Sequence, residues 1–404
     1  MTITIRPTTN NPRPLIVPGG VYGWHATRQD GSVVDTNTLG KQSKQSRAID
    51  STFLDMSFTS LRLSHVLSGG YDAAINAISD LFWTAPHMLA LDCVPNAWAA
   101  VPSDGERSGP ISEMLGWAFW RSYVSSVIVA ADLPAGTIFE PMNGPDTYWY
   151  DWQTVEGKEK YRQYWFFTQM GIEDAEVIRG RQYRIAGPSI SKVRWTEGDW
   201  LDFSDRIAKR LIRCDVITYA HYPNSFGEGV PDVTVAKFQD TVTAHRDKFF
   251  PGKPIIIREC NFDPSGNSPL YKSGESAIWL LQTVAGIREG FAEEWYVTGA
   301  YSQPHASSIV GLMGLYDLGT MEPTPQGQAM LALRQMGKMQ YDIEAEGDDT
   351  NAIWGWHDGQ GKAIMCNTSA NPVDISLTMG EVETLAPYSF SIWENDDYDV
   401  EDWK

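Results

Sequence analysis

Residues 254–260 read PIIIREC, and this short stretch is the most informative part of the sequence for the fold. Three consecutive isoleucines stand between a proline and the pair Arg258 and Glu259. A continuous apolar run of this kind, rich in β-branched residues, is typical of a strand that is buried on both faces. The stretch therefore predicts a buried strand that ends in a carboxylate.

Seven further strand-like stretches lie in the first 340 residues, and amphipathic stretches separate them. The strands are expected at VYGW (21–24), SLRLSH (60–65), MLALDCV (88–94), TIFEPM (137–142), YRIAG (183–187), DVITYAHY (215–222) and WYVTGAYS (295–302). The helices are expected at 43–56, 71–83, 111–131, 158–179, 201–213, 234–249 and 274–290. Eight alternating strand and helix units favour a closed (β/α)8 barrel, the TIM barrel, over an open doubly wound sheet.

From residue 341 onward, short alternating runs replace this pattern. The runs are NAIWGWHD (351–358), GKAIMCNTS (361–369), VDISLTM (373–379) and YSFSIWE (388–394). Runs of this kind, divided by turn residues, are typical of antiparallel strands. We therefore expect a (β/α)8 barrel over residues 1–340, a small C-terminal antiparallel β-sandwich over 341–396 and an acidic tail over 397–404.

Composition and charge limit the classes of function. The 404 residues are 42% hydrophobic and 21% charged, with a formal net charge of −19. A surface with this excess of acidic groups repels phosphate backbones and anionic lipids, so we expect neither nucleic acid nor a membrane as the partner. No apolar stretch is long enough to cross a bilayer, and the start MTITIRPTTNNPRP lacks the hydrophobic segment of a signal peptide, so a soluble chain is expected.

The spacing of cysteines and histidines argues against a metal or redox site. The four cysteines lie far apart and form no C-x-x-C pair, so we interpret them as buried free thiols. They are Cys93, Cys214, Cys260 and Cys366. The histidines His25, His65 and His305 show no metal-ligand spacing with one another, so we expect no catalytic metal and no cofactor.

In a barrel of this kind, the active site lies at the C-terminal ends of the strands. Polar residues follow the second to the eighth strand: Arg62, Ser64, His65, Asp92, Asn96, Glu140, Asn143, Asp146, Ser189, His221, Tyr222, Asn224, Glu259, Asn261, Tyr301, Ser302, Gln303 and His305. Glu259, at the end of the isoleucine run, can act as a nucleophile or base toward an anomeric carbon. An ion pair with Arg62 or Arg258 is the structural alternative, and it is compatible with this role because a nucleophilic carboxylate must be ionised.

Several of these stretches, taken in order, resemble glycoside hydrolases of clan A, and family 39 with its β-xylosidases and α-L-iduronidases more than the others. The stretches are SLRLSHVL (60–67), FEPMNGPD (139–146), IAGPS (185–189), CDVITYAHYPN (214–224) and PIIIREC (254–260). The run GLYDLGTMEPTPQGQAMLALRQM (314–336) also resembles that family's exit from the eighth strand. The order and spacing of these motifs carry the resemblance, which spans nearly the whole chain.

The resemblance implies a retaining glycosidase in which Glu259 is the nucleophile. Arg62 matches the arginine that keeps the nucleophile charged, and Asn143 matches the asparagine that binds the sugar 2-hydroxyl. His221 and Tyr222 match the group on the sixth strand that orients the nucleophile. The full set of expected substrate-binding residues is Arg62, His65, Asn143, His221, Tyr222, Tyr301 and Gln303.

One position departs from the family pattern, because Gly144 stands where the family has its general acid/base glutamate. A positioned proton donor contributes roughly 10²- to 10⁴-fold to such a reaction. Asp146, two residues further on, is the candidate acid/base, and Glu140 on the fourth strand is the alternative. Two further possibilities stay open: the barrel has lost its acid and only binds glycans, or residues 143–145 form an ordinary turn and the register differs.

The expected function is cleavage of a glycosidic bond in an oligo- or polysaccharide by a retaining mechanism, with a carbohydrate as the partner. A catalytically weak or inactive glycan-binding barrel is the alternative from a different class. A barrel enzyme of unrelated chemistry, such as a lyase, is the third. The 16 Trp and 17 Tyr suit a sugar ligand, since flat aromatic faces stack on sugar rings, but such residues also fill ordinary cores.

Overall fold

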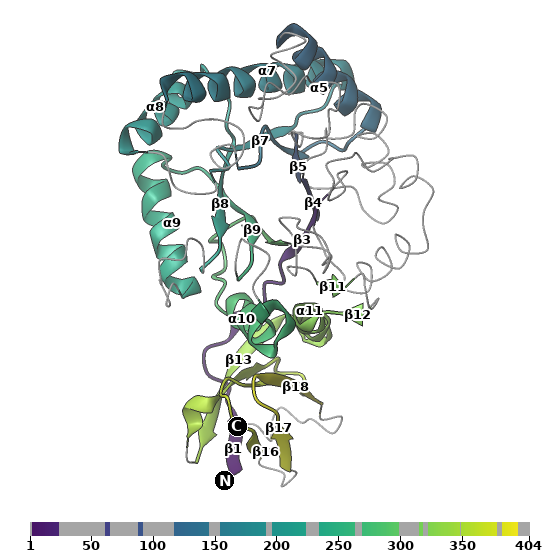
Figure 1. Cartoon of the computed structure of the whole chain (residues 1–404), viewed down its shortest axis with the longest axis vertical. Helices are drawn as coiled ribbons and strands as arrows, with labels where there is room; N and C mark the ends of the chain where they lie inside the picture. Colours follow the sequence, from purple (N-terminus) through teal and green to yellow (C-terminus); the bar gives the residue numbers. More distant parts are fainter. Residues whose placement is uncertain are drawn as a thin grey trace.

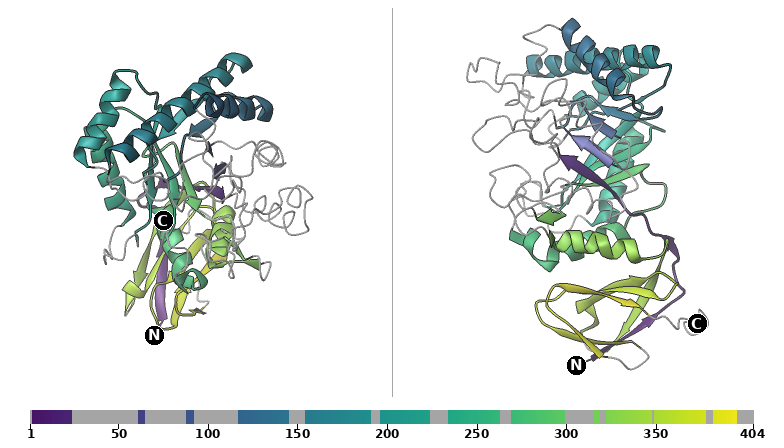
Figure 2. Two further views of the ribbon diagram at one scale, coloured as in Figure 1. Left: turned by 45° about the horizontal axis from the view of Figure 1, so that its top comes forward. Right: turned by 90° about the vertical axis from the view of Figure 1, so that its right-hand side faces the viewer.

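The computed structural model describes residues 2–23, 61–64, 88–91, 117–144, 154–190, 196–223, 234–262, 269–298, 315–317, 322–347, 349–377 and 382–394. These residues form two units along the long axis of the molecule (Figure 1). One unit is a barrel-shaped sheet with helices around it, and the other is a smaller, mostly antiparallel sheet. Figure 2 shows the helices α10 (Gly274–Ala285) and α11 (Pro325–Gln335) between the two units.

Eight parallel strands form a closed barrel in the order β10-β3-β4-β5-β6-β7-β8-β9. The strands are β3 (Gly19–Gly23), β4 (Leu61–Ser64), β5 (Met88–Ala90), β6 (Ile138–Glu140), β7 (Arg184–Gly187), β8 (Val216–His221), β9 (Ile255–Cys260) and β10 (Glu294–Thr298). Residues 296–298 of β10 lie opposite residues 19–21 of β3, and this pairing closes the sheet. The barrel-shaped parallel sheet expected from the sequence is confirmed, and each strand lies within two residues of an expected start.

Helices lie on the outer side of the barrel strands (Figure 1). Within the described residues they are α5 (Trp117–Ala131), α7 (Val155–Arg179), α8 (Glu197–Ala208), α9 (Val235–Phe249), α10 and α11. Helices α7, α8, α9 and α10 follow strands β6, β7, β8 and β9, which is the alternation that the sequence predicts. The helices expected at 43–56 and 71–83 lie outside the described residues.

The ends of α8 differ from the expected range of 201–213, and local signals account for both ends. The side chain of Thr196 accepts a hydrogen bond from the backbone of Asp199, while the side chain of Asp199 accepts one from the backbone of Thr196. This capping box satisfies two backbone N–H groups and sets the start of the helix at Glu197. At the other end, Arg210 has a φ of 58°, a left-handed conformation that does not continue a helix.

One layer of the barrel interior takes a single side chain from each of six strands: Met88, Ile138, Ala186, Val216, Ile256 and Tyr296. Because these side chains come from six different strands and contact one another, they point to the barrel centre. The neighbours of Ile256 on β9, Ile255 and Ile257, pack instead with Val242 of α9 on the helix side. The isoleucine run is therefore continuous because both faces of β9 are buried.

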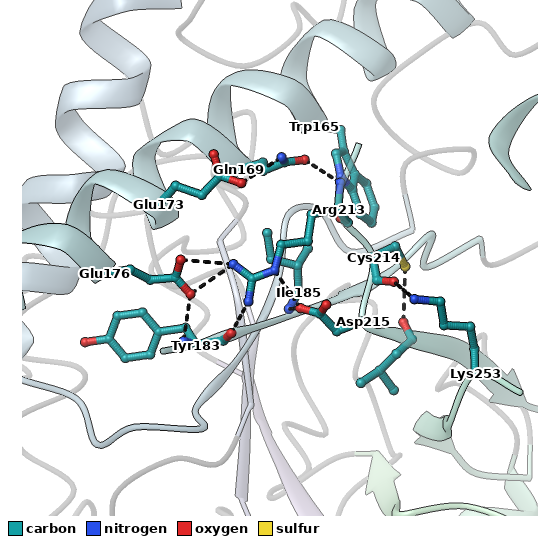
Figure 3. A network of polar contacts seen from close by, with 11 residues as sticks. Trp165, Gln169, Glu173, Glu176, Tyr183, Ile185, Arg213, Cys214, Asp215 and Lys253 are labelled. Carbon is teal, nitrogen blue, oxygen red and sulfur yellow. Dashed lines mark hydrogen bonds and ion pairs between the residues drawn. The ribbon is translucent and has the colours of Figure 1, made fainter. Parts of the chain in front are cut away.

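An ion cluster around Arg213 joins helix α7 to the beginnings of β7 and β8 (Figure 3). Nη1 of Arg213 lies 2.9 Å from Oε1 of Glu176, and Nε donates to Oδ2 of Asp215 at 2.9 Å. Glu176 also accepts a hydrogen bond from the backbone N–H of Tyr183 at 2.8 Å, and Asp215 accepts one from that of Ile185 at 2.9 Å. The cluster therefore fixes two strand starts to one helix at the N-terminal end of the barrel.

Replacing Arg213 by methionine should lower the free energy of unfolding by about 3 kcal/mol, because Glu176, whose side chain is only 9% exposed, loses its cation. The control is Lys209→Met, which removes an ion pair with Asp205 whose side chains are 62% and 53% exposed. That exposed pair should contribute less than about 1 kcal/mol. Urea denaturation followed by circular dichroism measures both variants, and equal losses would contradict the role given to Arg213.

The second unit is a sheet in which the N-terminal strand takes a central place. Its order is β17-β16-β1-β13-β14-β15-β18, and β2 pairs with β13. The strands are β1 (Thr2–Pro7), β2 (Arg13–Pro14), β13 (Met339–Glu346), β14 (Ile353–His357), β15 (Lys362–Asn367), β16 (Val373–Leu377), β17 (Val382–Leu385) and β18 (Ser389–Glu394). Residues 2–7 fall within the stretch 1–340 that the sequence assigns to the barrel, yet β1 is hydrogen-bonded to β13 and β16.

The core of this sheet joins residues from both ends of the chain. Its buried apolar side chains are Ile3, Ile5, Ile353, Met365, Ile375 and Leu385. Three short elements complete the described chain: the 3-10 helices η2 (Pro269–Lys272) and η3 (Thr350–Ala352), and a ribbon of β11 (Tyr316–Asp317) and β12 (Glu322–Pro323). The acidic tail expected at 397–404 lies outside the described residues.

Three cysteines lie in the described residues, and all three are buried free thiols, as expected. Burial raises the pKa of Cys214 and that of Cys260 to about 12, so both thiols stay protonated near neutral pH. Burial also raises the pKa of Cys366, and Cys93 lies outside the described residues. In the part of the chain that the structure describes, no helix is both long and apolar enough to span a bilayer.

Candidate active site

The candidate site is built around an irregularity in β9, the seventh strand of the barrel. Along β8, Tyr219 lies opposite Ile257 and the next residue, Ala220, lies opposite Glu259. Arg258 is therefore an extra residue on β9, and the pairing with β10 shows a register shift at the same place. An extra residue of this kind is a β-bulge, which changes the direction of nearby side chains and is common next to active sites.

The bulge brings two consecutive side chains to the inner side of the barrel. Ile257 and Cys260, on either side of it, both pack in the cluster that faces the helices. The side chains of Arg258 and Glu259, which lie between them, instead contact Asn143 and Tyr222, which follow the strands β6 and β8. Arg258 is completely buried, whereas the side chain of Glu259 is 14% exposed.

The guanidinium of Arg258 contacts three polar side chains. Its Nη1 donates to Oε1 of Glu259 at 2.8 Å and also donates to Oδ1 of Asn143. Its Nε lies 3.5 Å from Oε1 of Glu140, the last residue of β6, and both of these side chains are 0% exposed. The structure thus brings together Glu259, Asn143 and Glu140, three candidates that stand in separate motifs of the sequence.

The second carboxylate oxygen of Glu259 has its own partner. The hydroxyl of Tyr222 donates to Oε2 of Glu259 at 3.0 Å. Tyr222 comes directly after β8, so this contact lies at the C-terminal ends of the strands, where barrel active sites are found. Both oxygens of Glu259 therefore accept hydrogen bonds, one from Arg258 and the other from Tyr222, while the side chain as a whole keeps 14% of its surface exposed.

Glu140 lies in a buried network, which does not suit the role of an exposed proton donor. The hydroxyl of Ser189 donates to Oε1 of Glu140. The backbone N–H of Ser189 donates in turn to Oγ1 of Thr218 on β8 at 3.1 Å. Glu140 has no exposed surface and links β6 to Arg258 of β9 and, through Ser189, to Thr218 of β8.

Gly144 lies in a turn after β6. Its φ is 56°, a left-handed conformation that glycine adopts at little cost. Its backbone N–H donates to the carbonyl oxygen of Ser189 at 3.1 Å, which joins the ends of the fourth and fifth barrel strands. The local backbone conformation thus favours glycine at this position, and glycine offers no side chain to the site.

His221 faces the helices, in contrast to the expected substrate-binding role. It lies opposite Cys260 on β9, and Cys260 packs on the helix side. Residues that lie opposite each other on neighbouring strands point to the same face of the sheet, so His221 also points to the helices. Its ring lies 4.2 Å from that of Phe238 and 6.1 Å from that of Trp279, measured between centroids. Burial lowers the pKa of His221 to about 4, so the ring is neutral at pH 7.

The buried His221 should make stability depend on pH between 6.5 and 4. The pKa of an unfolded histidine is 6.5, and that of the folded protein is lowered to about 4, so in this range the unfolded chain binds a proton that the folded chain excludes. The contribution of His221 to the free energy of unfolding is present in full above pH 6.5, and the free energy of unfolding decreases by about 3 kcal/mol as the pH falls to 4. Urea denaturation at several pH values measures this, and His221→Phe should flatten the curve; identical curves would contradict it.

The remaining expected site residues lie outside the described part of the chain, except for the backbone of Arg62. The backbone of Arg62 lies in β4, paired with Val21 and Met88. Its side chain lies outside the described part of the chain, as do the residues His65, Asp146, Tyr301 and Gln303. Among the described residues, no group of three or more His, Cys, Asp or Glu is arranged to hold a metal ion.

Sequence reasoning underestimates two members of the cluster. The sequence predicts an ion pair of Glu259 with Arg62 or Arg258, and the pair with Arg258 is present. The further contacts of Arg258 with Glu140 and Asn143 are not predicted. Sequence reasoning treats Thr218 as an ordinary strand residue. The sequence shows that a charged residue, Arg258, ends the apolar run of β9, but it does not show which residues of other strands that side chain contacts.

The fold, a closed parallel barrel with a smaller sheet beside it, is similar to that of several solved glycoside hydrolases. The solved family 39 enzyme of Xanthomonas axonopodis pv. citri is 14% identical to this chain, with a TM-score of 0.64 over 93% of this chain and 81% of that one. A monomeric β-xylosidase of Caulobacter crescentus CB15 is also 14% identical, with a TM-score of 0.60 over 93% of this chain and 83% of that one.

A family 30 endoxylanase of Clostridium papyrosolvens C71 shares the fold at 10% identity, with a TM-score of 0.51 over 98% of this chain and 100% of that one. Identities this low establish the likeness of the fold alone. No protein-family model matches the sequence, and no curated protein matches it.

Proposed function

We propose that this protein is a glycoside hydrolase that cleaves an oligo- or polysaccharide by a retaining mechanism, with Glu259 as the nucleophile. The observation that carries the proposal is the carboxylate of Glu259 at the C-terminal end of β9. The side chain of Glu259 is 14% exposed, with one carboxylate oxygen 2.8 Å from Arg258 and the other 3.0 Å from Tyr222. A carboxylate that must attack an anomeric carbon has to be ionised and oriented, and these two donors serve both needs.

The proposed reaction uses residues at neighbouring strand ends. Glu259 attacks the anomeric carbon, the glycosidic oxygen leaves, and a covalent glycosyl-enzyme forms that water then hydrolyses. Asn143, after β6, is proposed to contact a sugar hydroxyl near the reacting carbon. Arg62, His65, Tyr301 and Gln303 complete the proposed sugar-binding surface. The likeness to solved barrel glycosidases supports a complete (β/α)8 barrel and a C-terminal β-sandwich as part of this proposal.

The leaving oxygen needs a proton, and Asp146 is the residue we propose to deliver it. It lies two residues beyond Gly144, after the turn that follows β6. Gly144 itself favours a second candidate function, a barrel that binds glycans with little or no catalysis. Its left-handed backbone and its hydrogen bond to Ser189 give this position a structural reason to be glycine.

Dinitrophenyl glycosides test the nucleophile, because their leaving group departs with little need for an acid. The wild-type protein should release dinitrophenol in a burst with at least one sugar from a panel of β-xylosides, β-glucosides and α-L-iduronides. Glu259→Gln should abolish the burst, since an amide is a poor nucleophile. The absorbance of the phenolate in stopped-flow measurements gives the burst directly.

The matched control is Glu394→Gln, which changes an exposed carboxylate that pairs with Lys362 on the C-terminal sheet. This variant should keep the burst in full. A wild-type protein that releases no phenol from any sugar, yet is retarded by soluble polysaccharide in an affinity gel, would support the binding function instead.

Gly144→Glu should restore a proton donor and increase turnover of alkyl glycosides or oligosaccharides by about 10²-fold or more. The control is Gly144→Gln, in which a residue without an acidic proton has to adopt the same left-handed backbone conformation. Both variants should lose about 1 kcal/mol of stability because of this conformation. Equal turnover by the two variants would mean that Gly144 does not occupy the acid/base position.

A further inference from the structure

The bulge in β9 contains one residue more than the strand needs to direct Glu259 inward. Ile257 and Cys260 both face the helices. If Arg258 were absent, Glu259 would be the single residue between them, and the alternation of side chains would still direct it to the inner face. The extra residue is therefore not required for the carboxylate. It adds a guanidinium to the barrel interior.

This guanidinium makes contacts that cross the barrel. Glu140 and Asn143 belong to the end of β6, whereas Arg258 and Glu259 belong to β9. Strands β7 and β8 separate β6 from β9 in the sheet. The contacts of Arg258 with Glu140 and Asn143 therefore span the interior, and they relate the end of the fourth barrel strand to that of the seventh.

The chemistry of the guanidinium determines the orientation of its partners. An arginine side chain has donors and no acceptors, so the atom of Asn143 that faces it is the carbonyl oxygen. The same Nη1 donates to Oε1 of Glu259, which leaves the opposite oxygen to Tyr222. A planar fork can serve two acceptors and an ion pair at once, whereas an ammonium group acts as a point charge.

We propose that Arg258 is a positioning residue that holds Glu259 and Asn143 in a fixed relation to each other, with Glu140 as its buried counterion. The inference rests on the proposed function, in which Glu259 attacks the sugar that Asn143 contacts. Reactions of this kind are sensitive to geometry, since a displacement of about 1 Å can reduce the rate by roughly 10²-fold. A guanidinium that links the two contacts is suited to prevent such displacements.

The kinetic test uses Arg258→Lys and Arg258→Met with dinitrophenyl glycosides. Arg258→Lys keeps the charge but not the fork, so kcat should fall by about tenfold to 10²-fold, while KM changes much less. Arg258→Met also removes the charge, so the acid limb of its pH–rate profile should move to higher pH. A purely structural role would lower the unfolding midpoint in both variants without that movement. Wild-type kcat in Arg258→Lys, or an unmoved acid limb in Arg258→Met, would overturn the proposal.

A second test does not depend on activity. Urea unfolding of Arg258→Met, Glu259→Gln and the double variant forms a cycle, and the loss in the double variant should be smaller than the two single losses added together. The same cycle with Glu394→Gln in place of Glu259→Gln should be additive. If the wild type releases no phenol, the proposed nucleophile role of Glu259 fails. The cycle still tests whether Arg258 and Glu259 stabilise each other in the folded protein. Additive losses in the first cycle would overturn the proposal whether or not the protein is an enzyme.

Discussion

The contact of one buried guanidinium with two carboxylates is the constraint on which the candidate site depends. Arg258 and Glu140 have no exposed surface, and Glu259 has little. Moving such charges out of water costs several kcal/mol per ion, and the cost is offset only when each charge finds an opposite charge and well-directed hydrogen bonds. Ser189, which donates to Glu140, and Tyr222, which donates to Glu259, supply hydrogen bonds that help to offset the cost of burying these charges.

The barrel is polar at both ends and apolar between them. At the N-terminal ends of the strands, Arg213 neutralises Glu176 and Asp215 and joins a long helix to two strands. A layer that includes Ile256 fills the middle. At the C-terminal ends, Arg258 joins strands across the interior. The first cluster joins the helix to the strands, and the second leaves the side chain of Glu259 partly exposed, so the second is the candidate site.

Much of this architecture can be predicted from the sequence, because the signals are local. The isoleucine run of β9 and the strand that ends in Glu140 are short apolar runs, and the helices follow them at regular intervals. The direction of the His221 side chain is not predictable in the same way, because it depends on how β8 pairs with β9, where His221 lies opposite Cys260. The bulge at Arg258 and the network of Glu140 are also hidden, since both depend on pairing between strands that lie far apart in the sequence.

The clearest case of long-range pairing is β1. Its alternating sequence TITIRP indicates a strand, but nothing nearby in the chain indicates its partners. Because β1 lies between β13 and β16, the entire barrel is topologically an insertion between the first strand of the small sheet and the rest of it. A ribosome must therefore synthesise more than three hundred further residues before β1 can pair with β13 (Met339–Glu346), and until then the apolar side chains of Ile3 and Ile5 lack the core that buries them. The small sheet can therefore form only after the whole barrel segment has been synthesised.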